Sequence, residues 1–154
     1  MKFTFIFLLL SCFSFVAGDK EKYEVKDGIA TLNGQSLFRV EAPEKWGLDY
    51  RIKTMDGTDV AYLKWINVND KNQKTESNPK GEVKYYEIIF LTNSLKCEVE
   101  SHYSKKDFAK LFHTNKIILD NKVNDEAIKT FVLIHGTRFS DRMKQGTTVI
   151  INNN

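Results

Sequence analysis

The chain has 154 residues and a formal net charge of +3, with 42% hydrophobic and 28% charged residues. This length corresponds to one ordinary domain, large enough to bury a core without covalent cross-links. The near balance of charges differs from the strongly basic composition of nucleic-acid-binding domains, so we expect no nucleic acid among the partners.

The N-terminal segment has the pattern of a secretory signal. Lys2 supplies a positive charge, residues 3–16 are apolar apart from three hydroxyl-bearing residues, and Val16-Ala17-Gly18 fits the pattern before a cleavage site. We therefore predict a signal peptide over residues 1–18 and a mature chain that begins at Asp19. The apolar run is shorter than the about 20 residues that a spanning helix needs, so no transmembrane span is expected after cleavage.

A second processing route involves Cys12. The sequence Leu9-Leu10-Ser11-Cys12 resembles a bacterial lipobox, although Leu10 stands where a small residue is usual and apolar residues continue after the cysteine. The resemblance implies lipidation of Cys12 and a membrane anchor. Both routes predict an exported bacterial protein that is periplasmic, envelope-associated or secreted. After cleavage at Gly18 only Cys97 remains, so no intrachain disulfide is expected.

The first half of the mature chain predicts a series of β-hairpins. Asp27-Gly28, Asn33-Gly34 and Asp56-Gly57 are dipeptides that tolerate the positive φ angles of tight turns. Each lies between short segments that favour strands, and in one segment apolar and charged residues alternate as on a strand with one wet face. The predicted strands cover residues 23–26, 29–32, 36–41, 48–55 and 58–66.

A long polar stretch follows at residues 67–82. It has turn signals at Asn78-Pro79 and Lys80-Gly81 and no strand or helix pattern. Loops of this length are uncommon in compact domains and are usually functional or disordered, so we predict a mobile excursion between two strands. Residues 83–91 are apolar on both faces, which predicts a central strand covered on both sides.

A seventh strand is predicted over residues 95–100, and the period then changes to that of a helix. Ser104 and Asp107 have the spacing of a capping box. Phe108 and Phe112 follow in an apolar stripe at helical spacing. These features predict a helix that begins directly after Ser104.

The second predicted helix starts at Asn124 and ends before Gly136, which is a typical residue at a helix C-terminus. Strands first and helices second is the α+β pattern. We predict an antiparallel β-meander of six or seven strands followed by two C-terminal helices packed on the sheet. This fold forms a single domain over residues 19–146, with a tail over residues 147–154.

Cys97 and His102 are the first pair to consider as a nucleophile and a base. Five residues of strand separate them by about 16 Å and place them on opposite faces, so they cannot share the hydrogen bond that activation requires. Cys97 alternates with apolar residues and is expected in the core. His113 and His135 lie at predicted helix C-termini, where a capping role is favoured. None of the three histidines has a partner at metal-ligand spacing, so we expect no metal and no cofactor.

Two charged patterns have alternative interpretations. Glu98 and Glu100 share one strand face with Lys96, which predicts a wet strand face, but paired carboxylates also perform acid–base catalysis. Lys105 and Lys106 lie at a helix N-terminus, where positive charge is unfavourable. With Lys110 and Lys116 nearby in sequence, they form either a solvated surface or a contact for an anionic envelope polymer.

Aromatic residues within or beside the predicted strands are candidates for a binding site. Tyr and Trp suit binding surfaces because one end is apolar and the other can hydrogen-bond. Tyr62 and Trp65 lie on opposite faces of one predicted strand, so at least one belongs to the core. The candidate ligand-binding residues are Trp46, Tyr62, Trp65, Tyr86 and His102.

The sequence thus predicts an exported, non-enzymatic module that binds a protein or a small ligand through its sheet face or the 67–82 loop. One alternative is a hydrolase whose site forms only in three dimensions, with His102, Glu98 and Glu100 in one pocket. The other is an accessory subunit of an envelope complex, anchored by a lipid on Cys12.

Overall fold

The computed structural model describes residues 21–44 and 47–145 of the chain. The predicted signal peptide over residues 1–18, the candidate lipidation site Cys12, the candidate ligand-binding residue Trp46 and the predicted tail over residues 147–154 lie outside these ranges.

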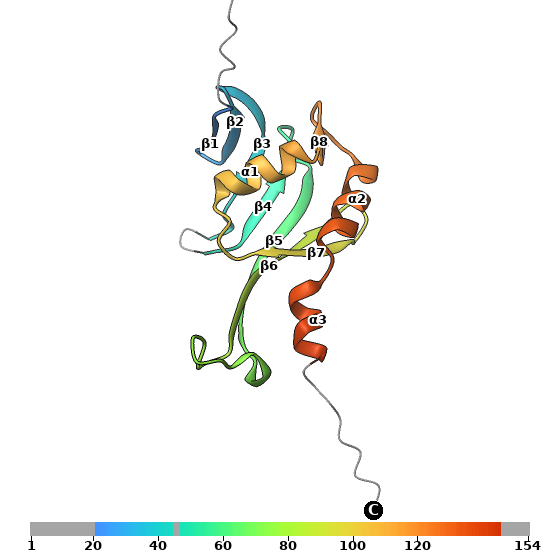
Figure 1. Cartoon of the computed structure of the whole chain (residues 1–154). Helices are drawn as coiled ribbons and strands as arrows, with labels where there is room; N and C mark the ends of the chain where they lie inside the picture. The colour runs from blue at the N-terminus through green and yellow to red at the C-terminus, as the bar shows by residue number, and fades with distance from the viewer. Residues whose placement is uncertain (1–20, 45–46, 146–154) are drawn as a thin grey trace, which may run out of the picture.

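The main element is a seven-stranded antiparallel sheet in which each strand pairs with the next along the chain (Figure 1). Its order in space is therefore the order in sequence, which confirms the predicted meander. The strands are β1 (Tyr23–Lys26), β2 (Ile29–Leu32), β3 (Gln35–Glu41), β4 (Tyr50–Lys53), β5 (Asp59–Asn69), β6 (Glu82–Phe90) and β7 (Lys96–Glu100).

Tight turns at the predicted dipeptides set the register of this sheet. Asp27 and Gly28 both have positive φ angles, of 49° and 76°, and Asn33-Gly34 repeats the arrangement. Two consecutive positive φ angles are the signature of the turn that fits the twist of a hairpin. At Asp56-Gly57 only the glycine has a positive φ, and the pairing of β4 with β5 shifts register at Lys53.

In the part of the chain that the structure describes, three α-helices and a small second sheet complete the fold. The helices are α1 (Lys105–Thr114), α2 (Asp125–His135) and α3 (Arg138–Gln145), with a 3₁₀ turn η1 (Lys71–Gln73), and β8 (Ile118–Leu119) pairs with β9 (Lys122–Val123). The predicted capping box of Ser104 and Asp107 starts α1, and the Asn124 side chain caps α2. Together with the sheet these helices confirm the α+β class. Helix α3 was not predicted from the sequence.

The core lies between one face of the sheet and helices α1 and α2 (Figure 1). Phe112 of α1 is at its centre, with its ring centroid 6.3 Å from Phe38, 6.0 Å from Phe90 and 6.4 Å from Phe131. These four rings come from two strands and two helices, and all are at most 1% exposed. The burial of large aromatic rings dominates the stability of such a core.

The second face of the sheet is covered at β6 and β7 by α3. The ring of Phe139 stacks on Tyr85 with a centroid distance of 5.3 Å, and Tyr85 is buried. The predicted two-sided cover of the sixth strand is therefore present at Tyr85 and Tyr86, whereas Glu87 and Ile89 farther along the strand are half-buried.

The polar stretch at residues 67–82 contains more strand than its sequence indicates. Strand β5 continues to Asn69 and β6 begins at Glu82, so the hairpin extends beyond the rest of the sheet (Figure 1). Backbone pairing continues there, with Val68 opposite Val83 and Asn69 opposite Glu82, because the ladder hydrogen bonds join main-chain atoms and need no continuous apolar face. The connecting loop is held by Asn78, whose side chain accepts from the Glu82 amide at 2.9 Å and donates to the Gln73 carbonyl at 3.3 Å.

The alternation of residues in β7 predicted that Glu98 lies on a solvent-exposed strand face, and this prediction is wrong. Its carboxylate is 2% exposed and accepts hydrogen bonds from the backbone amides of Phe139 at 2.7 Å and Ser140 at 3.1 Å. The prediction failed because α3 packs over this part of the sheet, and the amides of its first turn attract a negative charge. Lys96 is exposed and Glu100 is half-exposed, as expected.

Candidate functional site

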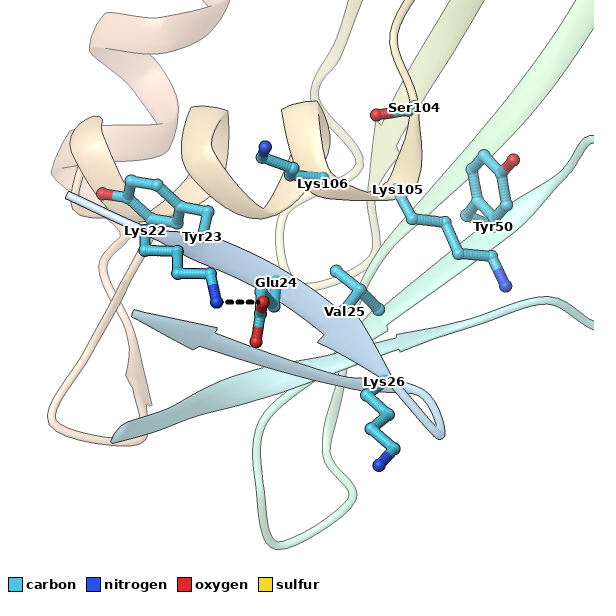
Figure 2. A pocket seen from close by; sticks show the side chains of 9 residues that line it. All are labelled: Lys22, Tyr23, Glu24, Val25, Lys26, Tyr50, Ser104, Lys105 and Lys106. Atoms are coloured by element: carbon cyan, nitrogen blue, oxygen red, sulfur yellow. Dashed lines mark ion pairs between the residues drawn. The ribbon is translucent and has the colours of Figure 1, made fainter. Parts of the chain in front are cut away.

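A groove runs between β1 and the first turn of α1, and Figure 2 shows the side chains that line it. It is open to solvent, with a cavity volume of about 790 Å³. Strand β1, the start of α1 and one residue of β4 form its walls. The lining residues are Lys22, Tyr23, Glu24, Val25, Lys26, Tyr50, Ser104, Lys105 and Lys106, and we call this site the basic groove.

The floor of the basic groove is fixed by contacts between β1 and α1. The Tyr23 side chain is only 3% exposed, and its hydroxyl hydrogen-bonds Nδ1 of His113 in the last turn of α1 at 2.8 Å. At the other end of the helix, the capping box of Ser104 and Asp107 closes the first turn. The two walls are thus joined at one end and locally ordered at the other. His113 contacts Tyr23 here, an interaction that its place at a helix C-terminus did not indicate.

The charge of the basic groove is strongly unbalanced. Four lysines and one glutamate line it, which gives a net charge of +3. Lys22 Nζ lies 2.8 Å from Glu24 Oε1. This hydrogen bond and ion pair lower the pKa of the Glu24 carboxyl, and the charges of Lys106 and Lys26 lower it further. A single carboxylate therefore lies in the field of three ammonium groups.

Lys105 contributes its charge next to an aromatic ring. Its Nζ lies 5.5 Å from the centroid of the Tyr50 ring, within the range of a cation–π contact. Tyr50 in turn stacks on Tyr86 with a centroid distance of 6.0 Å. The ring of Tyr50 thus stabilises a positive charge that the N-terminus of α1 disfavours. Lys110, which the sequence grouped with Lys105, lines a separate shallow depression beside Tyr103.

Two of the predicted aromatic residues line a second, smaller pocket. Tyr62 and Trp65 lie in a cavity of about 290 Å³ at the start of β4, together with Asp49. Asp49 accepts hydrogen bonds from the Tyr62 hydroxyl and from the Trp65 backbone amide, the latter at 2.8 Å. The hydrogen bond to Asp49 and burial raise the pKa of Tyr62. Both oxygens of Asp49 are therefore occupied by the chain itself.

Tyr86 packs against one lining residue of each pocket. Its side chain is 2% exposed, its ring is 5.0 Å from Trp65, and its hydroxyl donates to the Leu48 carbonyl at 3.1 Å. Burial is the main cause that raises the pKa of its hydroxyl. Tyr86 supports Tyr50 on one side and Trp65 on the other, so the structure connects three aromatic residues that the sequence places on different strands.

The residues of the catalytic alternative lie in three different surroundings. His102 is exposed in the turn after β7 and stacks on Tyr103 with a centroid distance of 5.0 Å. Glu98 is held by α3, and Glu100 lies 3.5 Å from Arg138. Cys97 is fully buried, and burial raises the pKa of its thiol to about 12, so the thiol stays protonated at neutral pH.

Two further observations concern the described part of the chain as a whole. Residues 21–44 and 47–145 contain no group of three or more His, Cys, Asp or Glu side chains placed to hold a metal ion. None of the helices within these ranges is long and apolar enough to cross a membrane.

Sequence reasoning identified one wall of the basic groove and missed the other. The lysines of α1 stood out because positive charge is unusual at a helix N-terminus. Lys22 and Lys26 gave no signal, because lysines on a short polar strand are ordinary surface residues.

Comparisons with known proteins found no relative of this chain. It matches no protein-family model, no curated protein and no solved structure.

Proposed function

We propose that this chain is an exported binding module that takes an anionic ligand in the basic groove. Export rests on the signal pattern of residues 1–18. The observation that carries the binding proposal is the charge of the groove. Its net charge of +3, on nine lining residues, equals the formal net charge of the whole chain. The excess positive charge is therefore concentrated at one site.

The groove also has the form of a binding site. Lys22 and Glu24 are both more than half exposed, and an ion pair in such surroundings is weak and screened by salt. An incoming anion therefore competes with Glu24 for Lys22 at little cost, while Lys26, Lys105 and Lys106 supply further positive charge. The buried, hydrogen-bonded Tyr23 provides a fixed floor against which these flexible side chains converge on a ligand.

The proposal is tested with tripolyphosphate as the anionic probe and the mature protein labelled with ¹⁵N. We expect the amide shifts to move along β1 and at residues 104–106, with an affinity that falls as salt is added. The test variant replaces Lys22, Lys26, Lys105 and Lys106 by Gln. The matched control replaces four exposed lysines outside the groove: Lys71, Lys74, Lys80 and Lys122.

The two variants carry the same net charge, so comparing them distinguishes binding at the groove from non-specific attraction of an anion to a basic protein. We expect the groove variant to bind tripolyphosphate about tenfold more weakly than the control. Equal weakening in both variants, or shifts that map outside the groove, would contradict the proposal.

A further inference from the structure

We infer that the ligand of the basic groove is an extended acidic polypeptide segment that pairs with the outer edge of β1 as an eighth strand. This inference rests on the proposed function and goes further, because it names the class of ligand and the main-chain atoms that bind it.

The first argument is the unpaired edge of β1. This strand lies at the end of the sheet and pairs only with β2. The Lys22 carbonyl accepts from the Asn33 amide at 2.9 Å, so this residue pair is a hydrogen-bonded one. Hydrogen-bonded pairs alternate with non-bonded pairs along two antiparallel strands. The amides and carbonyls of Tyr23 and Val25 therefore point away from β2.

These outward groups lie in the basic groove. All five residues from Lys22 to Lys26 line it. Within the described ranges, the backbone amides and carbonyls of Tyr23 and Val25 have no hydrogen-bond partner on this side. A strand edge with free donors and acceptors is the template that an extended peptide uses when it adds to a sheet.

The opposite edge of the same sheet is covered at the middle of β7. The Glu98 amide of β7 donates to the Gly136 carbonyl at 2.8 Å, between α2 and α3. The Glu98 carboxylate then holds the first turn of α3 through Phe139 and Ser140. Proteins usually cover strand edges in this way to prevent unwanted pairing. The fold thus covers the middle of one edge strand and leaves the other edge strand open beside a charged groove.

The lysines identify the partner as acidic. Successive side chains of a strand point to opposite faces, so Tyr23 and Val25 face α1 whereas Lys22 and Lys26 face the other side. Figure 2 shows Lys105 and Lys106 on the α1 side of β1 and Lys26 on the opposite side. An added strand would meet positive charge on both of its faces.

The same charges disfavour a second copy of this chain as the partner. Pairing β1 with β1 of another copy would bring two sets of four groove lysines together, and like charges across a strand pair are destabilising. An acidic segment replaces this repulsion by attraction. Because β1 has four residues, or about 13 Å of strand, the added segment is short and the complex is expected to be weak.

The experiment compares three fluorescent peptides with identical charge. The first alternates Glu and Val over seven residues. The other two have the same sequence with N-methyl groups on alternate residues, one in each of the two possible registers. N-methylation removes the main-chain donors but keeps every carboxylate. We expect the unmodified peptide to bind at least about tenfold more tightly than the methylated register that faces β1, and we expect the amides of Tyr23 and Val25 to become protected from hydrogen exchange.

A protein variant provides the reciprocal test. Val25→Pro removes one outward donor and leaves the bonds between β1 and β2, a position at which edge strands accept proline. Its binding of the unmodified peptide should weaken severalfold, by a larger factor than its binding of tripolyphosphate. If this variant fails to fold, the peptides alone decide the question.

The outcomes separate the inference from the proposed function. Equal binding of methylated and unmodified peptides, or tripolyphosphate binding without peptide binding, would overturn the eighth strand and leave an anionic groove that serves another polyanion. If the protein bound neither the peptides nor tripolyphosphate, both the eighth-strand inference and the proposed anionic groove would be overturned.

Discussion

The backbone amide of Phe139 donates a 2.7 Å hydrogen bond to the buried carboxylate of Glu98, which joins the start of α3 to the edge strand β7. The amide of Ser140 adds a second bond to the same oxygen at 3.1 Å. The stack of Phe139 on Tyr85 lies beside these bonds. This group of contacts, rather than an apolar stripe, attaches α3 to the sheet.

Replacing Glu98 by Gln is therefore expected to detach α3. The amide side chain keeps an acceptor but loses the charge that favours a helix N-terminus. We expect the free energy of unfolding to fall by about 1.5–3 kcal/mol, as for a hydrogen bond to a charged group. Urea denaturation measures this change, and hydrogen exchange locates it in α3.

The matched control for this prediction is Glu100→Gln. Glu100 shares the strand face with Glu98, but it is half-exposed and lies 3.5 Å from Arg138. Exposed ion pairs contribute about 0–1 kcal/mol, so this variant should be close to the wild type. Equal losses in the two variants would show that Glu98 has no special role in holding α3.

Replacing Tyr23 by Phe tests the contact between β1 and α1. The change removes the hydroxyl that hydrogen-bonds His113 at 2.8 Å and retains the buried ring. We expect a loss of about 1 kcal/mol in stability, measured by urea denaturation. Tyr103→Phe is the control, because within the described residues its hydroxyl makes no hydrogen bond, and its stability should not change. An unchanged Tyr23→Phe variant would show that the contact does not support the floor of the groove.

Much of the fold was predictable because local signals decide it. Turn dipeptides such as Asp27-Gly28 require positive φ angles, and together with alternating strands they define each hairpin. The caps at Ser104 and Asn124 fix the starts of two helices. These features depend on neighbours within a few residues, and the sequence displays such neighbours directly.

The features that were missed depend on contacts between distant segments. Glu98 alternates with Lys96 and Glu100 as if exposed, and only the packing of α3 buries it. The basic groove has the same origin, since Lys22 and Lys105 lie far apart in the sequence and meet because α1 packs over β1. Neither juxtaposition leaves a periodic pattern that sequence analysis can detect.

The pH dependence of stability should include a contribution from His135. Burial, together with the nearby charge of Arg138, lowers the pKa of this imidazole in the folded protein. The unfolded chain therefore binds the proton more readily than the folded protein. The contribution of His135 to the free energy of unfolding is fully present above the unfolded pKa of about 6.5. This contribution is lost as the pH falls below that value toward the folded pKa.

Urea denaturation at pH 7.5 and pH 5 measures this effect. His135→Gln should show a smaller decrease in stability between these two pH values than the wild type. His102→Gln is the control, because His102 is exposed, and it should retain the wild-type decrease. If His135→Gln keeps the full decrease, other groups account for the pH dependence.

The loop between β5 and β6 depends on the absence of a side chain at Gly81. This residue has a φ of +66°, and a Cβ placed on it would overlap the carbonyl oxygen of Asp70. The two residues approach closely because the Asp70 amide donates to the Gly81 carbonyl at 2.8 Å. Gly81→Ala therefore combines an unfavourable backbone conformation with a direct clash against main-chain atoms that cannot move aside.

Gly34→Ala separates these two effects. Gly34 also has a positive φ, of +83°, but a Cβ there would meet nothing within 4 Å. We expect the control to lose about 1–2 kcal/mol from the backbone conformation alone, and Gly81→Ala to lose more. Thermal and urea denaturation of both variants give the difference. Similar losses would mean that the loop relaxes around the new methyl group, so that the close approach of Asp70 and Gly81 does not determine its structure.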